Sequence, residues 1–147
     1  LWIETTFSEL KKVLTSSNIL LINESESKLL TKRANIENAA EELLEMGPEI
    51  VVIKKGSEGA ELFSNRETIK IGAFPAKEVI DPTGAGDVFA GTFIAALAEK
   101  DSNQTALLKA SAMASFSIES FGVDRLINLS DYDLTERIEY LKTTVKS

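Results

Sequence analysis

The chain has 147 residues, within the range of one domain, and a net charge of −7 argues against a general nucleic-acid binder, which needs a basic surface. It contains neither cysteine nor histidine, which excludes disulfides, thiol nucleophiles, cysteine zinc sites, Ser-His-Asp triads and histidine acid–base catalysis. No stretch approaches the roughly 20 apolar residues of a membrane span, so we expect no membrane partner, and with the acidic net charge we expect no nucleic-acid partner. The absence of cysteine is consistent with the cytoplasmic protein that we expect.

Apolar runs and helical patterns alternate in the first part of the chain. The apolar runs are short and flanked by polar residues, which is typical of buried parallel strands. The expected elements, in order, are a helix at Phe7–Leu14, a strand at Asn18–Asn23, a helix at Ser25–Lys32, a helix at Ile36–Met46 capped by Asn35, and a strand at Ile50–Ile53. This alternation predicts a parallel sheet covered by helices.

Turn residues divide the middle of the chain into short extended segments. A glycine turn at Lys55–Gly59 leads into an apolar run, and Ser64–Arg66 forms a second, hairpin-like turn. Thr68–Gly72 and Phe74–Val79 are predicted as further short strands. We therefore expect antiparallel strands at one edge of a mostly parallel sheet, within a three-layer α/β/α arrangement.

The second half of the chain is predicted to be helical. Phe89, Phe93 and Leu97 recur at helical spacing and are expected in the core. The predicted helices are Asp87–Glu99, Gln104 to about Ser120, and Asp131 to about Thr143, the last with an apolar face of Leu134, Ile138 and Leu141. We assign residues 1–147 to one continuous α/β portion.

The segment Thr83–Asp87 lies between a predicted strand and a predicted helix. Its glycines, Gly84 and Gly86, let the backbone approach a ligand closely. The first amides of the following helix have no partners within it, and the helix dipole adds positive potential, so the loop can form an anion hole for a phosphoryl group. Asp87 is then placed to accept a proton from an attacking hydroxyl. The spacing fits equally well an Asp87 that only caps the helix, with glycines that only make a tight turn.

Two other nucleotide-binding motifs do not fit this segment. A Walker A loop requires a lysine between its last glycine and the Ser or Thr, whereas Gly91 is followed directly by Thr92. A dinucleotide-binding fingerprint that starts at Gly84 requires glycine or alanine where Phe89 stands, which disfavours an oxidoreductase domain. Phosphoryl transfer suits the available residue types, because it needs positioning and charge stabilisation more than covalent help.

The run Asp81–Asp87, followed by Phe89, Ala90 and Gly91, resembles the second signature of the ribokinase-like (PfkB) carbohydrate kinases. Weaker resemblances to the same family occur in the expected order at Leu1-Trp2, Asn23–Glu26, Lys54–Gly59 and Gly122. The resemblance covers essentially the whole chain. It implies the ribokinase-like α/β fold and an ATP-dependent kinase of sugars or related small molecules.

The resemblance also assigns roles to individual residues. It implies that Asp87 is the catalytic base and that Gly84, Ala85 and Gly86 form the anion hole. It implies that Asn23 and Glu26 organise Mg²⁺, water and the ATP phosphates, that Lys54, Gly56, Ser57 and Gly59 lie beside the nucleotide, and that Ser111 lies near the adenine. Asp81 and Thr83 resemble backbone ligands for an activating K⁺ ion, a feature that varies within the family.

Simpler structural interpretations stay open for several of these residues. Asn23 and Glu26 also fit a strand-to-helix cap, and the turn at Gly56–Gly59 also fits a hairpin. Ser111 also fits a small residue at a close helix–helix contact.

The family's sugar-contacting motif and lid belong to an N-terminal half that this sequence does not contain. The acceptor is therefore open between a sugar and a nucleoside. We expect the isolated chain to be inactive and the full-length parent to be a homo-oligomer, most simply a dimer. A non-catalytic nucleotide-binding domain is the alternative function, and the intact Asp87 argues for catalysis instead.

Overall fold

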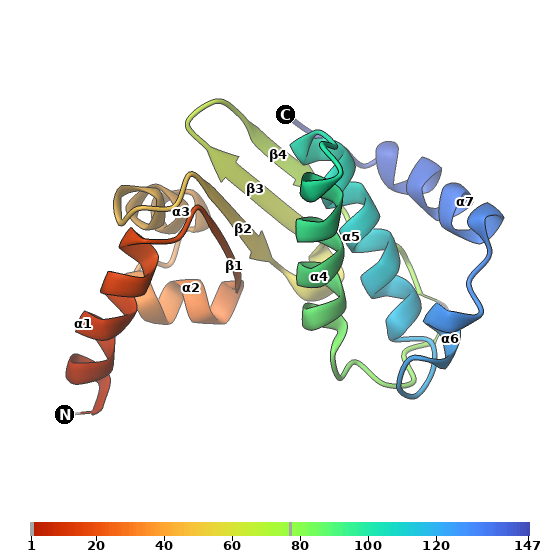
Figure 1. The fold of residues 1–147 in the computed structure, drawn as a ribbon, viewed down its shortest axis with the longest axis horizontal. Helices are drawn as coiled ribbons and strands as arrows, with labels where there is room; N and C mark the ends of the chain where they lie inside the picture. Colours follow the sequence, from red (N-terminus) through yellow and green to blue (C-terminus); the bar gives the residue numbers. More distant parts are fainter. Residues whose placement is uncertain (1, 77) are drawn as a thin grey trace. The chain divides into compact units, whose positions relative to one another are not determined.

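The computed structural model of the chain describes residues 2–76 and 78–147, with the side chains of those from residue 9 onward. The chain divides into two compact units, Leu1–Lys55 with Glu61–Thr68, and Gly56–Ala60 with Ile69–Ser147. The elements up to the last strand are α1 (Trp2–Thr15), β1 (Ile19–Asn23), α2 (Glu24–Thr31), α3 (Ile36–Glu45), β2 (Ile50–Lys54), η1 (Gly56–Glu58), β3 (Ala60–Ser64) and β4 (Thr68–Ile71) (Figure 1). The helices that follow are α4 (Ala85–Ala98), α5 (Asn103–Ser117), α6 (Asp124–Ile127) and α7 (Asp131–Lys142).

The sheet has four strands in the order β1-β2-β3-β4. β1 and β2 are parallel, and their register places Asn23 opposite Lys54 at the carboxyl ends of the two strands. Figure 1 shows β3 running against β2, and the Ser64 amide donates to the Glu67 carbonyl (3.0 Å) in the turn between β3 and β4. The prediction of an α/β fold in which antiparallel strands border a parallel part is confirmed.

The predicted strand at residues 74–79 is wrong, because none of the described residues in that segment is in a strand. The C-terminal segment takes the place it would need beside β4: Lys70 and Lys146 exchange two backbone hydrogen bonds of 2.8 Å. Phe74 packs edge-on against Tyr140, with ring centroids 5.2 Å apart. The segment thus packs its half-buried aromatic ring against a helix, and the end of the chain makes the sheet pairing instead.

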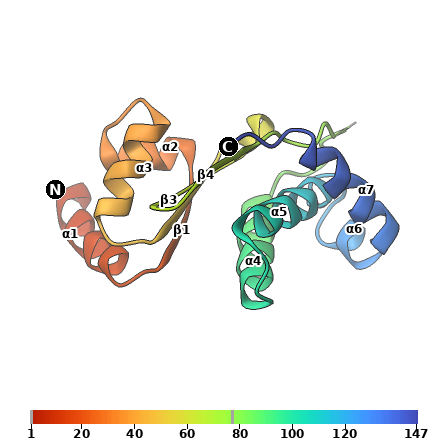
Figure 2. The ribbon, with the colours of Figure 1, turned by 90° about the horizontal axis from the view of Figure 1, so that it is seen from above.

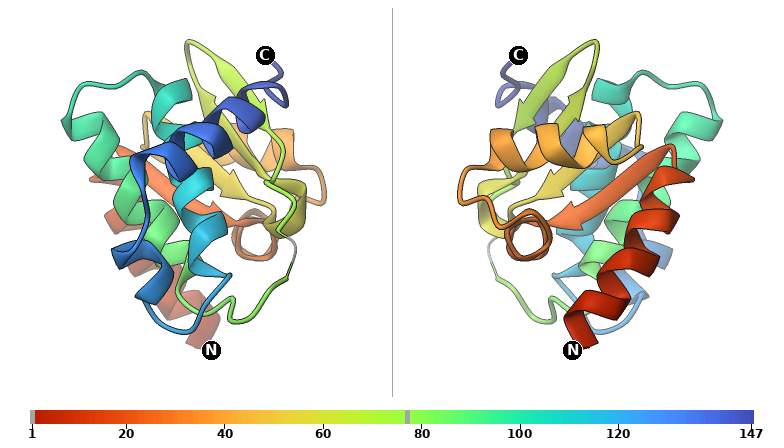
Figure 3. Two further views of the ribbon diagram at one scale, coloured as in Figure 1. Left: turned by 90° about the vertical axis from the view of Figure 1, so that its right-hand side faces the viewer. Right: turned by 90° about the vertical axis from the view of Figure 1, so that its left-hand side faces the viewer.

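The core of the first unit lies between α3 and the strands. In the right-hand view of Figure 3, β1 and β2 run in the same direction and α3 lies over them. α3 begins after Asn35, whose side-chain oxygen accepts a hydrogen bond from the Asn38 amide (2.8 Å), as the sequence predicted. The buried apolar residues of this core are Ile22, Ala40, Leu43, Val51, Ile53 and Phe63.

In the second unit, α5 lies between α4 and α7 (Figures 1 and 2). Phe89 and Phe93 of α4 are buried, as predicted, whereas Leu97 is only half-buried and Ala96 occupies the buried position of that turn. Small residues on α5 allow this close packing; those that are fully buried are Ala106, Ala110 and Ala112. Among the helices that the structure describes, none has both the length and the apolar character needed to cross a membrane.

Candidate functional site

Short-range hydrogen bonds shape the loop that precedes α4. The Asp81 carboxylate accepts a hydrogen bond from the Thr83 amide (2.9 Å), which bends the backbone over two residues. Gly84 is the residue that caps α4, with φ of +79°, in the left-handed region that favours glycine. The loop therefore turns directly into the first helical residue, Ala85, and Gly84 is required there for its backbone conformation.

The same loop is anchored to the end of α5. The Ile118 carbonyl accepts hydrogen bonds from the Ile80 amide (2.8 Å) and the Asp81 amide (3.2 Å). Hydrogen bonds from the Thr83 amide and side chain hold the pKa of Asp81 below its ordinary value, so the carboxylate that shapes the loop stays ionised. Both interactions fix the direction in which the chain enters the glycine segment.

The first turn of α4 presents backbone amides that have weak partners or none. The Ala85 amide makes only a long hydrogen bond to the Pro82 carbonyl (3.3 Å). The Gly86 amide donates no backbone hydrogen bond within the part of the chain that the structure describes, whereas the Asp87 amide donates to the Gly84 carbonyl (3.0 Å). Open amides at the positive end of a helix dipole are suited to an anion such as a phosphoryl group.

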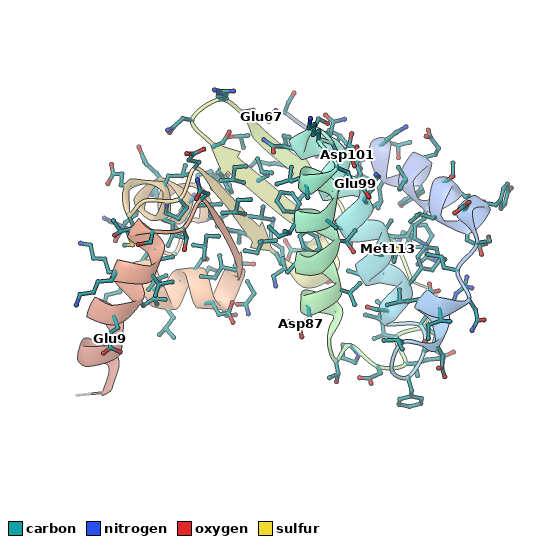
Figure 4. All side chains as sticks on the ribbon, viewed as in Figure 1. Glu9, Glu67, Asp87, Glu99, Asp101 and Met113 are labelled. Carbon is teal, nitrogen blue, oxygen red and sulfur yellow. The ribbon has the colours of Figure 1, made fainter. Side chains whose placement is uncertain are left out.

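Asp87 is the third residue of α4 and its side chain is exposed. Figure 4 shows it at the end of α4 where the helix begins, with Glu99 and Asp101 at the opposite end. The interpretation of Asp87 as the helix cap is wrong, since Gly84 occupies the cap position and no side-chain cap bond is formed. Within the described residues the Asp87 carboxylate makes no hydrogen bond or ion pair that would occupy it, so it is available to a ligand.

Asn23 and Glu26 form a capping box at the start of α2. The Asn23 side-chain oxygen accepts from the Glu26 amide (2.8 Å), and one Glu26 carboxylate oxygen accepts from the Asn23 amide (2.9 Å). The structural interpretation of this pair is thus confirmed. Glu26 is exposed and its carboxylate has a second oxygen, so the cap is compatible with a further role toward a ligand.

The turn after β2 begins next to the capping box in the sheet, because Lys54 pairs with Asn23. Gly56 opens the short helix η1, and the Gly59 amide donates to the Gly56 carbonyl (3.1 Å) to close the turn. Ser57 lies between them and is exposed. The turn therefore presents its backbone and one hydroxyl to solvent.

Ser111 lies on α5 between two fully buried alanines and is itself half-buried. That setting is what close helix packing requires. The adenine contact that the resemblance implies for Ser111 is not tested by this setting and stays a prediction.

The predicted site residues fall into groups that belong to different units of the chain. In the first unit the parallel register and the capping box bring together Asn23, Glu26 and Lys54. In the second unit the loop and the first turn of α4 bring together Asp81, Thr83, Gly84, Ala85, Gly86 and Asp87, and the same unit contains Gly56, Ser57, Gly59 and Ser111. Among the described residues, no cluster of three or more carboxylates that could hold a metal ion by itself is present.

Comparison with known proteins identifies the family of this chain. The family model described as pfkB family carbohydrate kinase matches residues 1–128. The chain belongs to the PfkB family of carbohydrate kinases. A curated relative, the nucleoside kinase of Methanothermobacter thermautotrophicus, is 36% identical over 115 residues, which make up 78% of this chain and 36% of that protein. The ribokinase of Arabidopsis thaliana is 35% identical over 117 residues, 76% of this chain and 31% of that protein.

Solved structures of PfkB-type kinases share the fold of this chain. The structure of Arabidopsis thaliana ribokinase complexed with ribose and ATP superposes with a TM-score of 0.76 at 30% identity, covering 88% of this chain and 43% of that one. An E. coli protein described as ribokinase II, in complex with ATP and Mg²⁺, gives a TM-score of 0.78 at 31% identity, covering 96% of this chain and 44% of that one. These likenesses confirm the ribokinase-like α/β fold. The PfkB-family chain spans less than half the length of each of these proteins.

Two charged residues with structural roles were missed at the level of sequence, Lys55 and Arg137. Lys55 donates to a Glu61 carboxylate oxygen (2.9 Å), with side chains 17% and 8% exposed, and this pair joins the two ends of the turn after β2. Arg137 is buried on α7, on the face predicted to be apolar. Its position within a turn of Leu134 and Leu141 was the available signal, since such spacing places a residue on the same helix face.

Proposed function

We propose that this chain is the nucleotide-binding and catalytic portion of a longer ATP-dependent kinase that transfers the γ-phosphoryl group to a hydroxyl of a sugar or nucleoside. The observation that carries the proposal is the first turn of α4. An unoccupied, exposed Asp87 carboxylate lies beside open backbone amides at the positive end of a helix. A base and an anion hole in one turn are two of the parts that phosphoryl transfer to an alcohol uses.

In the proposed reaction Asp87 accepts the proton of the attacking hydroxyl as its oxygen bonds to the γ-phosphorus. The bond from that phosphorus to the bridging oxygen of ATP breaks, and ADP leaves with the electron pair of that bond. Negative charge on the equatorial oxygens of the transferred group is stabilised by the amides of Gly84, Ala85 and Gly86. The left-handed conformation of Gly84 supports this role, because it brings the backbone to the start of the helix without a side chain in the way.

Asn23 and Glu26, at the carboxyl end of β1, are proposed to organise Mg²⁺ and the ATP phosphates, beside Lys54 at the carboxyl end of β2. Mg²⁺ prefers oxygen ligands and keeps several of its waters, so an exposed Glu26 carboxylate next to the Asn23 amide fits a metal held largely through water. When bound, Mg²⁺ neutralises charge on the phosphates. Lys54, Ser57 and the glycine turn are proposed to lie along the nucleotide, and Ser111 near the adenine. The carbonyls of Asp81 and Thr83 are proposed ligands of a K⁺ ion.

The experiment that tests the proposal measures phosphate transfer by the full-length protein against a panel of sugars and nucleosides with ATP and Mg²⁺. We expect turnover at about 1–100 s⁻¹ with at least one acceptor. The isolated chain of 147 residues should consume no ATP in response to any acceptor, because Asp87 and its anion hole do not by themselves align a hydroxyl or exclude water. Absence of turnover from the full-length protein with every acceptor would favour the non-catalytic nucleotide-binding alternative.

The proposed metal role of Asn23 has a matched control within the same unit. Asn23 and Asn35 stand at the starts of α2 and α3, and the side-chain oxygen of each accepts from the amide three residues on at 2.8 Å, although only Asn23 belongs to a capping box. We expect either asparagine-to-alanine change to destabilise the protein by about 1 kcal/mol, the usual effect of losing an N-cap. Only Asn23→Ala should raise the Mg²⁺ concentration needed for half-maximal turnover, by about tenfold or more. Equal Mg²⁺ titrations for the two variants would reduce Asn23 to a helix cap.

A further inference from the structure

Arg137 is a buried cation whose surroundings connect α7 to the loop that carries the proposed catalytic residues. Its side chain is 10% exposed, and burial lowers the pKa of the guanidinium despite the nearby Glu119 carboxylate. A buried charge is costly unless it is paired and hydrogen-bonded. Its hydrogen bonds and ring contacts within the described residues come from α5, from the residues just after it, and from the segment before the loop.

Arg137 holds the last turn of α5 from two sides. One terminal nitrogen donates to the Ser115 hydroxyl (3.0 Å) and the other to a Glu119 carboxylate oxygen (2.9 Å). The guanidinium carbon also lies 3.4 Å from the centroid of the Phe116 ring. The Arg137 guanidinium is planar and forked, and it bonds to one residue before Phe116 and one after it. It therefore restrains both the position and the rotation of the last turn of α5.

The turn that Arg137 holds is the one that anchors the glycine loop. Ile118 lies between Phe116 and Glu119, and its carbonyl accepts the amides of Ile80 and Asp81 at 2.8 and 3.2 Å. A displacement of this carbonyl would therefore move the start of the loop. Because the loop runs without interruption into the first turn of α4, such a displacement would be transmitted to the proposed anion hole.

Arg137 also contacts the segment that leads to the loop. The guanidinium carbon lies 4.0 Å from the centroid of the Phe74 ring, on which Tyr140 of the same helix also packs edge-on. The segment from Phe74 to Asp81 is therefore held at one end by Arg137 directly and at the other by the carbonyl of Ile118. The described residues of this segment are not in a strand, so no sheet pairing adds to these contacts.

We propose that Arg137 is a positioning residue for catalysis, which sets the place of the Asp81–Asp87 loop through the end of α5 and through Phe74. The expected fall in kcat rests on the proposed function, whereas the ordering of the loop by Arg137 does not depend on it. Arg137 is not proposed to contact the reacting groups. Its effect is exerted on where the backbone amides and the Asp87 carboxylate lie.

The first test is hydrogen–deuterium exchange of the full-length protein, in peptides that cover residues 78–88, for Arg137→Met and for Lys142→Met as the matched control. Lys142 lies on the same helix and pairs with Glu139 at the surface, without a contact to α5 among its described interactions. We expect exchange of the loop amides to quicken by about five- to tenfold in Arg137→Met and to be unchanged in Lys142→Met. Unchanged loop exchange in a folded Arg137→Met protein would overturn the inference.

The second test separates positioning from stability. Well below the unfolding temperature, Arg137→Met should lower kcat by about 10–100-fold while the KM of the acceptor stays within about twofold. Arg137→Lys, which keeps the charge and loses the fork, should recover part of the rate. A normal kcat in Arg137→Met would overturn the catalytic part of the inference. If the unmodified protein shows no turnover, the proposed function fails, and the exchange result still decides whether Arg137 orders the loop.

Arg137→Met could lose its fold, in which case Glu119→Gln replaces it in both tests. This change keeps an acceptor for the guanidinium and removes the charge, so a smaller effect of the same direction is expected on loop exchange and on kcat. Glu119→Gln with loop exchange and kcat equal to those of the unmodified protein would overturn the inference.

Discussion

Asp87→Asn in the full-length protein should lower kcat by about 10²–10⁴ while ATP binding is retained, since that range is the usual contribution of a positioned general base. Asparagine has nearly the same size and shape, and Gly84, rather than Asp87, caps the helix, so the change should leave the start of α4 intact. The loss would therefore report on proton transfer. Steady-state turnover with the best acceptor and ATP affinity by equilibrium binding are the measurements.

The control for this variant lies at the other end of the same helix. Glu99 follows the last residue of α4 and is largely exposed, and within the described residues its side chain makes a long ion pair to Lys109 (3.8 Å). Glu99→Gln removes one carboxylate, as Asp87→Asn does, and should leave kcat unchanged. Near-normal turnover of Asp87→Asn would remove Asp87 from the role of base, whatever the control shows.

Gly59→Ala should destabilise the protein by more than about 4 kcal/mol, among the largest effects of single substitutions. The φ angle of Gly59 is +98°, and a Cβ there would lie 2.0 Å from the Ile71 carbonyl oxygen and 2.6 Å from the carbonyl carbon of Gly72. Both contacts are with backbone, which cannot move aside as a flexible side chain can. Chemical denaturation of the purified variant, or its failure to accumulate folded, measures the effect.

Gly56→Ala is the matched control, because it alters the other glycine of the same turn. Gly56 also has a positive φ of +58°, but a Cβ there would meet no atom within 4 Å. We expect a loss of only about 1–2 kcal/mol, the effect of the left-handed conformation on its own. Equal stabilities of the two variants would show that the close approach of Gly59 to β4 does not constrain the turn. If Gly59→Ala is unfolded and Gly56→Ala folded, then only Gly56→Ala can report on nucleotide contacts.

The sequence by itself determined most of the local structure and the chemistry of the loop. The helix that starts after Asn35 and the strand that ends at Asn23 were predicted, because each depends on periodicity and on caps within a few residues. The helix at the glycine loop was predicted too, although it begins at Ala85, two residues before the predicted start at Asp87. The motif around Asp87 also identified the family, which the family comparison confirmed for residues 1–128. Residue types and their order along the chain were sufficient for these conclusions.

Tertiary structure alone decided features that depend on partners distant in the sequence. The segment at 74–79 was expected to be a strand, but a strand requires an edge to pair with, and Lys146 occupies that edge beside β4. Asp87 could not be separated from a helix cap until the backbone of Gly84 was seen to fill that position. The spacing of Arg137 from Leu134 and Leu141 placed it on the apolar face of α7, but a single charge on an amphipathic helix is ordinarily solvated, so its burial could not be predicted. Its burial depends on Phe116 and Glu119, which reach it only when α5 and α7 pack together.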